Sequence, residues 1–317
     1  LAHKVLVDRN TTIFWDRKHN REYKVISTYT LPFIQQYIKR FIAARDYSNI
    51  KQGDFDAFVV GSDQVWRPKY FGQNIISNAF LSFAKDWDVK RISYAASFGT
   101  EEWEYTEEQT SECKEWIKRF DAVSVRESSA LQLCKEHLGI DALHVLDPTM
   151  LLSATDYIQL FKEANTPKSS GSLMCYILDE TEDKQKVVSN VEEVLNLTAF
   201  SVNSKYEDLN APLEERIQPP VEVWLRGFYD AEFVVTDSFH ACVFSILFEK
   251  PFVVYGNKDR GMARFHSLLS IFGLENRLVT NSAEAQKVIF VPIDWSLVNA
   301  KKKEWQEKSY NFLKNNL

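Results

Sequence analysis

Apolar residues follow two alternating patterns along the chain. Short runs rich in β-branched and aromatic residues, such as "DAFVVG" and "EFVVT", are typical of buried strands. Longer segments in which apolar residues recur every three or four positions are typical of amphipathic helices. We expect strands at 56–61, 90–96, 121–126, 142–146, 172–178, 197–203, 232–236 and 251–255. We expect helices at 106–120, 127–139, 154–163, 180–195, 221–231 and 296–316.

Strands that alternate with helices indicate an α/β fold with parallel sheets. The chain has 317 residues, which favours two cores, and the Ser/Gly/Pro-rich stretch 164–172 is a linker candidate. We predict two Rossmann-like domains that face a cleft, at 1–163 and 172–295, and a C-terminal helix at 296–317 that packs back on the N-terminal domain. The first fifty residues lack a Gly-rich strand-to-helix opening, which leaves open whether the first strand of the N-terminal domain is missing.

Composition and charge exclude several classes of protein. The net charge of -6, with no long basic block, argues against a general nucleic-acid binder. No apolar run approaches the roughly 20 residues that span a bilayer, and no signal peptide precedes the first strand. We therefore expect a cytoplasmic protein without a transmembrane segment, although peripheral contact with the inner face of the membrane stays open.

The cysteines and histidines show no metal-binding spacing. The cysteines lie apart in apolar segments, form no CxxC pair, and are expected to be buried, reduced thiols. We predict no metal and no cofactor. The residues concerned are Cys113, Cys134, Cys175, Cys242, His3, His19, His137, His144, His240 and His266.

A polar cluster interrupts the apolar pattern after the strand "EFVVT". Asp237 or Ser238 suits the N-cap of the helix that follows, and His240 lies in its first turn. A helix start offers unpaired N–H groups and partial positive charge, so it is a natural site for phosphate or carboxylate. The alternative is that His240 only makes a local hydrogen bond.

A similar cluster follows "DAFVV" in the first half. Ser62 and Asp63 come after Gly61 and can cap a helix or hold hydroxyl groups. Gln64 and Trp66 are less easily explained by capping, and an aromatic ring beside polar groups suits the wall of a sugar site. We predict acceptor binding for Ser62, Gln64 and Trp66.

Cations follow two further strands. Lys258, Arg260 and Arg264 come after the strand at 251–255, and Arg126 ends the strand "DAVSVR". In an acidic protein these residues suggest an anionic ligand, whereas a solvated loop is the plain alternative for the first three. Because parallel strands bind ligands beyond their carboxyl ends, the four clusters are expected to meet in the cleft.

These segments together resemble the polysaccharide pyruvyl transferase family. "FDAFVVGSDQVWRP", "ISYAASFG", "DAVSVRE", "VLDPTMLL", "VEVWLRGFYDAEFVVTDSFHACVFSILFEKPFVVYGN" and "RGMARFHSLLSIFGLENRLV" stand in the order of the family, over roughly 55–280. The resemblance implies a GT-B-like arrangement of the two domains. It also implies transfer of an enolpyruvyl group from phosphoenolpyruvate to two hydroxyls of a sugar in a cell-surface polysaccharide precursor, which can be lipid-linked.

The resemblance also implies roles for individual residues. His240 matches the histidine of the family's donor site, and we group it with Asp63 as catalytic. Arg126 matches a donor-binding arginine. Better-known members carry Arg-Leu-His where this chain has Ser238, Phe239 and His240. We therefore expect donor binding from Arg126, Ser238, Asp237, Arg264, Arg260 and Lys258.

Two other functions compete with this one. The cleft of a GT-B-like fold also suits a glycosyltransferase that uses a nucleotide sugar. A non-catalytic relative that binds a glycan or an anion is the second alternative.

Overall fold

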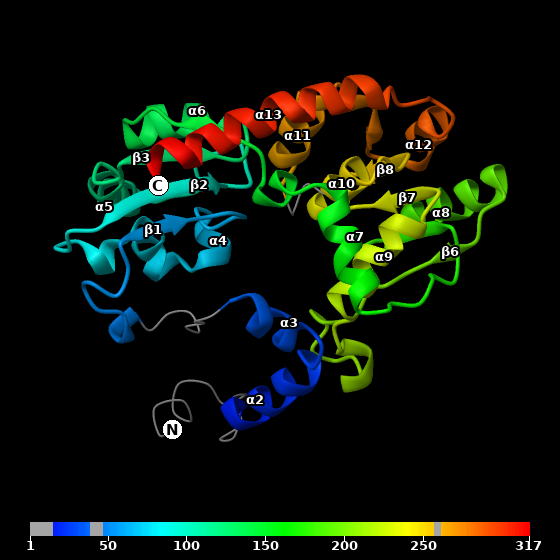
Figure 1. Ribbon diagram of the computed structural model, residues 1–317, viewed down its shortest axis with the longest axis horizontal. Coiled ribbons are helices and arrows are strands. Elements are labelled where there is room, and N and C mark those ends of the chain that lie inside the picture. Colours follow the sequence, from blue (N-terminus) through cyan, green and yellow to red (C-terminus); the bar gives the residue numbers. More distant parts are fainter. Residues whose placement is uncertain (1–14, 39–46, 257–260) are drawn as a thin grey trace.

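The computed structural model describes residues 15–38, 47–256 and 261–317, and it contains two parallel sheets (Figure 1). This confirms the predicted α/β class with parallel sheets. The first sheet has the order β1-β2-β3-β4, with β1 at Ala57–Val60, β2 at Lys90–Ala96, β3 at Ala122–Val125 and β4 at Leu143–His144. The second has the order β6-β5-β7-β8-β9, with β5 at Leu173–Tyr176, β6 at Ala199–Phe200, β7 at Phe233–Thr236, β8 at Phe252–Tyr255 and β9 at Leu278–Val279.

Helices connect and cover the strands. The first half contains α2 (Trp15–Ile26), α3 (Thr30–Tyr37), η1 (Tyr47–Asn49), α4 (Pro68–Phe71), η2 (Gln73–Phe80), η3 (Ser82–Ala84), α5 (Glu107–Ile117), α6 (Ser129–Leu133), η4 (Cys134–Leu138), η5 (Pro148–Leu151) and α7 (Ala154–Glu163). The second contains α8 (Glu182–Leu195), η6 (Leu213–Arg216), α9 (Val221–Asp230), α10 (Phe239–Leu247), α11 (Ala263–Phe272), η7 (Glu275–Arg277), α12 (Ser282–Val288) and α13 (Trp295–Asn316).

The first sheet has a core on each face. Val125 belongs to one cluster with Cys113 of α5 and Leu133 of α6, whereas Ile92 and its neighbours belong to a separate cluster with Phe312 of α13. Because side chains alternate along a strand, β2 and β3 can serve both clusters. The central strand β2 is buried at every position except Lys90.

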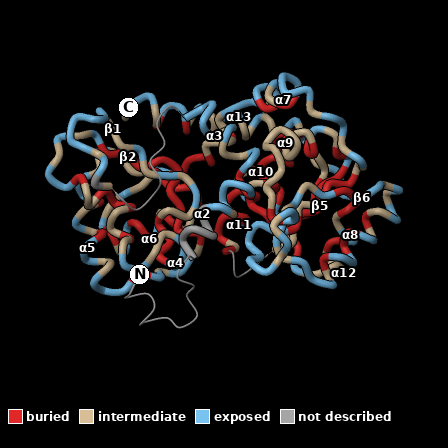
Figure 2. Tube along the Cα trace, turned by 90° about the horizontal axis from the view of Figure 1, so that it is seen from below, coloured by how far each residue is buried: buried red, intermediate tan, exposed pale blue. Residues whose placement is uncertain are grey.

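The second sheet shows the same division. Met174 and Val234 face the cluster that includes α7, α9, α10 and α11, whereas Leu173, Phe233 and Val235 face the cluster that includes α8 and α12. In Figure 2 the buried positions gather inside each half of the molecule. The strand order reverses at β5, which pairs with β6 on one side and with β7 on the other. Such a switch point leaves a crevice for ligands at the carboxyl ends of the strands.

Helix α13 joins the two halves. It begins beside the second sheet and crosses to the first (Figure 1), where the Ser309 hydroxyl accepts a hydrogen bond from Leu146 N (3.0 Å). Gln306 donates to the carbonyl of Met150 (2.6 Å). At a second junction between the halves, Ser128 N donates to Ser267 Oγ (2.9 Å) and this hydroxyl lies 3.2 Å from His144 Nε2.

Helices α2 and α3 form an arm, residues 15–37, that sequence reasoning did not predict. The arm precedes the first sheet along the chain, yet it contacts the segment just before α9. Gln218 N donates to Ile26 O (3.0 Å), and Glu22 pairs with Arg216 (3.3 Å). The arm therefore lies against the second half of the molecule (Figure 1).

Candidate active site

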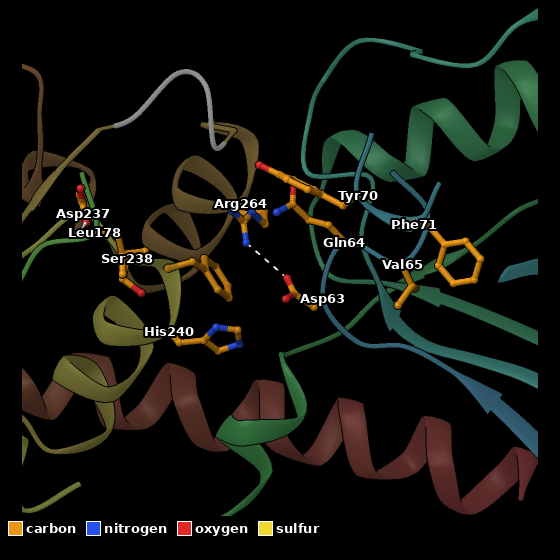
Figure 3. A pocket seen from close by; sticks show the side chains of 11 residues that line it. Asp63, Gln64, Val65, Tyr70, Phe71, Leu178, Asp237, Ser238, His240 and Arg264 are labelled. Carbon is orange, nitrogen blue, oxygen red and sulfur yellow. Dashed lines mark hydrogen bonds and ion pairs between the residues drawn. The ribbon is translucent and has the colours of Figure 1, made fainter. Parts of the chain in front are cut away.

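A cavity of about 440 Å³ lies where the two sheets meet, at the carboxyl ends of their strands. Asp63 follows β1 and enters it from the first sheet, whereas Ser238 and His240 enter from the loop and helix after β7 (Figure 3). Arg264 enters from the first turn of α11. We call this cavity the inter-sheet pocket.

Arg126 organises the wall on the side of the first sheet. One of its terminal nitrogens donates to Asp147 (2.8 Å) and the other to Asp63 (2.8 Å). Burial alone would raise the pKa of Asp147, but the charge of Arg126, together with His240 and the hydrogen bonds from Thr149 and Arg126, outweighs burial and lowers that pKa. The pKa of Asp63 is lowered by the same balance. Both carboxylates are therefore ionised at neutral pH.

His240 faces the inter-sheet pocket from α10, and its side chain is 38% exposed. Its Nε2 lies 3.8 Å from Asp147 Oδ2, which is too long for a hydrogen bond but close for a charge interaction. Removal from bulk water lowers the pKa of His240; the nearby guanidiniums add to this effect, and Asp147 opposes it. The ring is thus accessible to a ligand and held beside a buried carboxylate.

Arg264 supplies a second guanidinium to the same place. Its Nη1 lies 3.5 Å from Asp63 Oδ1, the oxygen that also accepts from Arg126 (Figure 3). The Phe239 ring lies 4.6 Å from the guanidinium carbon of Arg126 and 5.2 Å from that of Arg264. Burial, with Arg126 nearby, lowers the pKa of Arg264 to about 10, so it stays charged. Two cations therefore converge on one half-exposed carboxylate.

The predicted donor residues after β7 have unequal positions. Ser238 caps α10 by accepting from Ala241 N (3.5 Å) and lines the inter-sheet pocket. Asp237 lines it as well, but its carboxylate accepts from Lys184 (2.7 Å) and from Leu178 N (2.7 Å). The Asp237 carboxylate thus joins the loop after β7 to α8 and to the loop after β5, which is a structural role.

Of the three predicted acceptor residues, only Gln64 lines the inter-sheet pocket. It accepts a hydrogen bond from Arg67 (3.1 Å). Ser62 is half-buried but does not line the cavity. The prediction for Trp66 was wrong, because this ring is 0% exposed, stacks on Phe80 and donates to Ala79 O (3.1 Å). It belongs to the core and cannot form a sugar wall.

Two site predictions fall outside the part of the chain that the structure describes: Lys258 and Arg260. One important residue was not singled out from the sequence: Asp147, which follows β4. Its position after a strand was the signal, because the same reasoning found Arg126. Tyr70, which lines the inter-sheet pocket from α4, carried no such signal.

Searches of the described residues gave two further findings. They contain no group of three His, Cys, Asp or Glu side chains that could hold a metal ion. Among the same residues, no helix is both long and apolar enough to cross a membrane. The four cysteines are unpaired, and Cys175 is the one that is half-buried.

Three solved structures are similar to this chain at low sequence identity. A structure of the wall teichoic acid polymerase TagF matches with a TM-score of 0.36 and 12% identity, over 72% of this chain and 64% of that chain, so this chain spans less than two thirds of the TagF chain. Sucrose-phosphate synthase from Thermosynechococcus elongatus matches with a TM-score of 0.35 and 9% identity (75% and 72%). An O-GlcNAc transferase from Thermobaculum terrenum matches with a TM-score of 0.33 and 11% identity (75% and 46%).

No curated protein matches the sequence. The model of one protein family, polysaccharide pyruvyl transferase, matches residues 1–259. This match includes the strands and helix starts that build most of the inter-sheet pocket, and it ends before Arg264. The chain therefore belongs to the polysaccharide pyruvyl transferase family.

Proposed function

We propose that the protein transfers the enolpyruvyl group of phosphoenolpyruvate to two hydroxyls of a sugar in a cell-surface polysaccharide precursor, forming a cyclic pyruvate ketal. The observation that carries the proposal is that Arg264 and His240 line one pocket between the sheets, where Arg126, buried behind the wall, holds Asp63. The donor has a phosphate and a carboxylate. Two guanidiniums and a helix start are suited to binding both groups.

Arg264 replaces the arginine that better-known family members carry two positions before the histidine. Ser238 occupies that position here and leaves space without charge. The guanidinium from α11 reaches the same pocket, beside the first turn of α10. We assign one anionic group of the donor to Arg126 and Arg264, in the place now taken by the Asp63 carboxylate.

In the proposed reaction, protonated His240 donates its proton to the methylene carbon of the donor. One sugar hydroxyl attacks the adjacent carbon, and phosphate leaves as the second hydroxyl closes the ring. Of the two hydroxyl protons, one passes through Asp63 and restores the proton that His240 gave to the methyl group, and the other leaves with phosphate. Asp147, 3.8 Å from the imidazole, stabilises the protonated form.

Asp63 is the proposed acceptor of a hydroxyl proton. Arg126, with His240 and Arg264, lowers the pKa of Asp63, which makes it a weak base. An anionic donor group bound to these guanidiniums neutralises their positive charge. Their stabilisation of the Asp63 carboxylate then weakens, and the pKa of Asp63 rises. Donor binding would thus prepare the base for the attack by the sugar.

A phosphate-release assay tests the proposal. Phosphoenolpyruvate is incubated with nucleotide-linked and lipid-linked sugars that carry suitably spaced diols, and phosphate and ketal are both measured. We expect His240→Gln to lower turnover by about 10²- to 10⁴-fold. The matched control is His266→Gln, at an exposed position on α11 outside the inter-sheet pocket. Turnover by His240→Gln at the unmodified rate would exclude the mechanism.

The cellular setting is part of the same proposal. Phosphoenolpyruvate is an intracellular metabolite, so we place the reaction in the cytoplasm, where precursor sugars for surface polysaccharides are assembled. A lipid-linked acceptor would bring the protein to the inner face of the membrane. Co-sedimentation with membranes that contain such precursors, compared with membranes lacking them, tests this point.

A further inference from the structure

A second and larger cavity, of about 930 Å³, lies beside the inter-sheet pocket. It is formed by the loops after β5 and β6, by the segment before α9 and by the first turn of that helix. Thr30, at the start of α3, contributes from the arm. We call this cavity the arm groove. Its position at strand carboxyl ends, next to the switch point at β5, is typical of ligand sites in α/β proteins.

The arm holds one side of the groove in place. Thr30 Oγ1 donates to Gln218 Oε1 (3.0 Å), and both residues line the cavity. Behind them, Gln218 N donates to Ile26 O (3.0 Å) and Glu22 pairs with Arg216 (3.3 Å). The groove is therefore built from segments distant in sequence that are joined by hydrogen bonds and an ion pair, so its shape exists without a ligand.

The lining of the arm groove suits a sugar chain. Tyr176, Tyr206 and Trp224 supply aromatic surface, and Tyr206 is 42% exposed. Asn203 and Gln218 supply amide groups. A pyranose ring has an apolar face of C–H groups that packs on aromatic rings, and an edge of hydroxyls that bonds to amides and carboxylates.

The charge of the groove differs from that of the inter-sheet pocket. Of the described residues that line the groove, five are acidic and one is basic, and the basic residue, Lys205, already pairs with Glu215 (2.6 Å). Like-charge repulsion disfavours phosphate and diphosphate groups on such a surface. The inter-sheet pocket has Arg264 and His240 in its lining. A neutral glycan fits the groove, and an anion fits the pocket.

The two cavities share a residue. Leu178, in the loop after β5, lines both of them. A chain of sugars bound along the arm groove can thus reach past Leu178 with its terminal residue and enter the pocket that contains His240.

We propose that the arm groove binds a neutral oligosaccharide and presents its terminal sugar to the inter-sheet pocket. That this oligosaccharide is the acceptor rests on the proposed function. Binding of the glycan itself does not depend on it, so the two can be tested separately.

The test is titration of the full chain with a panel of neutral tetrasaccharides made of glucose, galactose, mannose and their N-acetylated amines, followed by calorimetry. We expect saturable binding of at least one member at millimolar concentration or below. Loss of the exposed ring in Tyr206→Ala should weaken this binding about 3- to 10-fold. Phe290→Ala, which removes an aromatic ring that is 68% exposed and does not line the groove, should leave it unchanged.

Titration with phosphoenolpyruvate separates this proposal from the proposed function. Tyr206→Ala should bind phosphoenolpyruvate as the unmodified protein does. If Tyr206→Ala weakens glycan binding but the protein does not bind phosphoenolpyruvate, the proposal for the arm groove stands and phosphoenolpyruvate is excluded as the donor. The groove assignment is overturned if no panel member binds, if Tyr206→Ala has no effect, or if uridine diphosphate competes with the glycan.

Discussion

The segments after β1 and after β7 look alike in sequence but differ in what they do. Each has an apolar strand followed by serine and aspartate, in the order Ser62-Asp63 in one and Asp237-Ser238 in the other. The side chain of Asp63 is 60% exposed and lies between two guanidiniums in the inter-sheet pocket, whereas that of Asp237 is fully buried and paired with Lys184. One carboxylate is available to a ligand, and the other stabilises the second sheet.

The difference arises from the neighbouring elements and not from the motif itself. Lys184 comes from the first half of α8, which packs beside β5, and its buried ammonium reaches Asp237. After β1 the chain turns at Gly61 with φ of 137°, and Asp63 itself has φ of 51°. That turn directs the Asp63 side chain into the pocket.

Asp237→Asn should have the largest effect on stability. It removes the negative charge that compensates the ammonium group of Lys184, which is 4% exposed. An uncompensated buried charge costs about 3–5 kcal/mol. Denaturant unfolding measures the loss. The double variant with Lys184→Met should be less destabilised than the sum of the single variants. A loss under 1 kcal/mol for Asp237→Asn would show that the pair is not structural.

Gly61→Ala should have the next largest effect, at the other strand end. A Cβ atom at this position would lie 2.0 Å from the carbonyl oxygen of Tyr94, and the positive φ is strained for alanine. We expect a loss of about 2–4 kcal/mol. Gly53→Ala is a useful control, because φ is also positive there but no atom lies within 4 Å of the added Cβ. Equal losses in the two variants would assign the cost to backbone strain alone.

Ser238→Ala should cost about 1 kcal/mol, because it removes the N-cap of α10. Ser62→Ala, the matching change after β1, should stay within about 0.5 kcal/mol, since this half-buried serine does not cap a helix. Thermal unfolding of the two variants measures the contrast. Equal shifts in both would contradict the different roles assigned to the two segments.

Asp63→Asn should have the smallest effect on stability, under about 1 kcal/mol, because the carboxylate is largely exposed and solvent screens its ion pairs. The pKa of Asp63 is lower in the folded chain than in the unfolded chain. Its contribution to stability is therefore present above pH about 4 and is lost as the pH falls through the folded-state pKa. Unfolding curves of both proteins should converge in acid, and a difference that persists there would contradict this account.

The same variant should have opposite effects on binding and turnover. Without the Asp63 charge, Arg126 and Arg264 bind phosphoenolpyruvate more tightly, whereas the proposed proton acceptor is lost. The pKa of His240 is also lowered further, because Asp63 helps to raise it. Activity that needs protonated His240 falls as the pH rises through that pKa, so the falling limb should move to lower pH. Calorimetry and a pH profile measure the two effects.

The sequence predicted the repeating parts of the fold well, for a physical reason. β1, β2, β3, β5, β7 and β8 lie within the expected ranges because their apolar runs must be buried. The two-residue strands β4 and β6 also lie within expected ranges, whereas β9, equally short, was not predicted. The arm was missed because its packing depends on contacts with residues 213–218, which lie far away in the sequence.

The site was predicted in part. Reasoning from strand ends found Asp63, Arg126 and His240, which the structure brings together. It failed for Trp66, because the sequence shows an aromatic residue beside polar groups but not the direction of its ring. The direction is set by Phe80, which comes from an irregular helical segment that no pattern indicated. The sequence also did not show that Asp237 is paired whereas Asp63 faces the pocket, since Lys184 lies 53 residues from its partner Asp237.

Helix α13 has a consequence for how substrates enter. Its 22 residues form one continuous rod of roughly 33 Å, attached to both halves of the molecule. Pulling the halves apart along this rod would break the backbone hydrogen bonds of the helix, whereas a small rotation of one half about the rod leaves them intact and strains only contacts such as that of Ser128 N with Ser267 Oγ. Ligand exchange should therefore proceed by twisting around this axis, and any widening will be greatest on the side of the molecule farthest from α13.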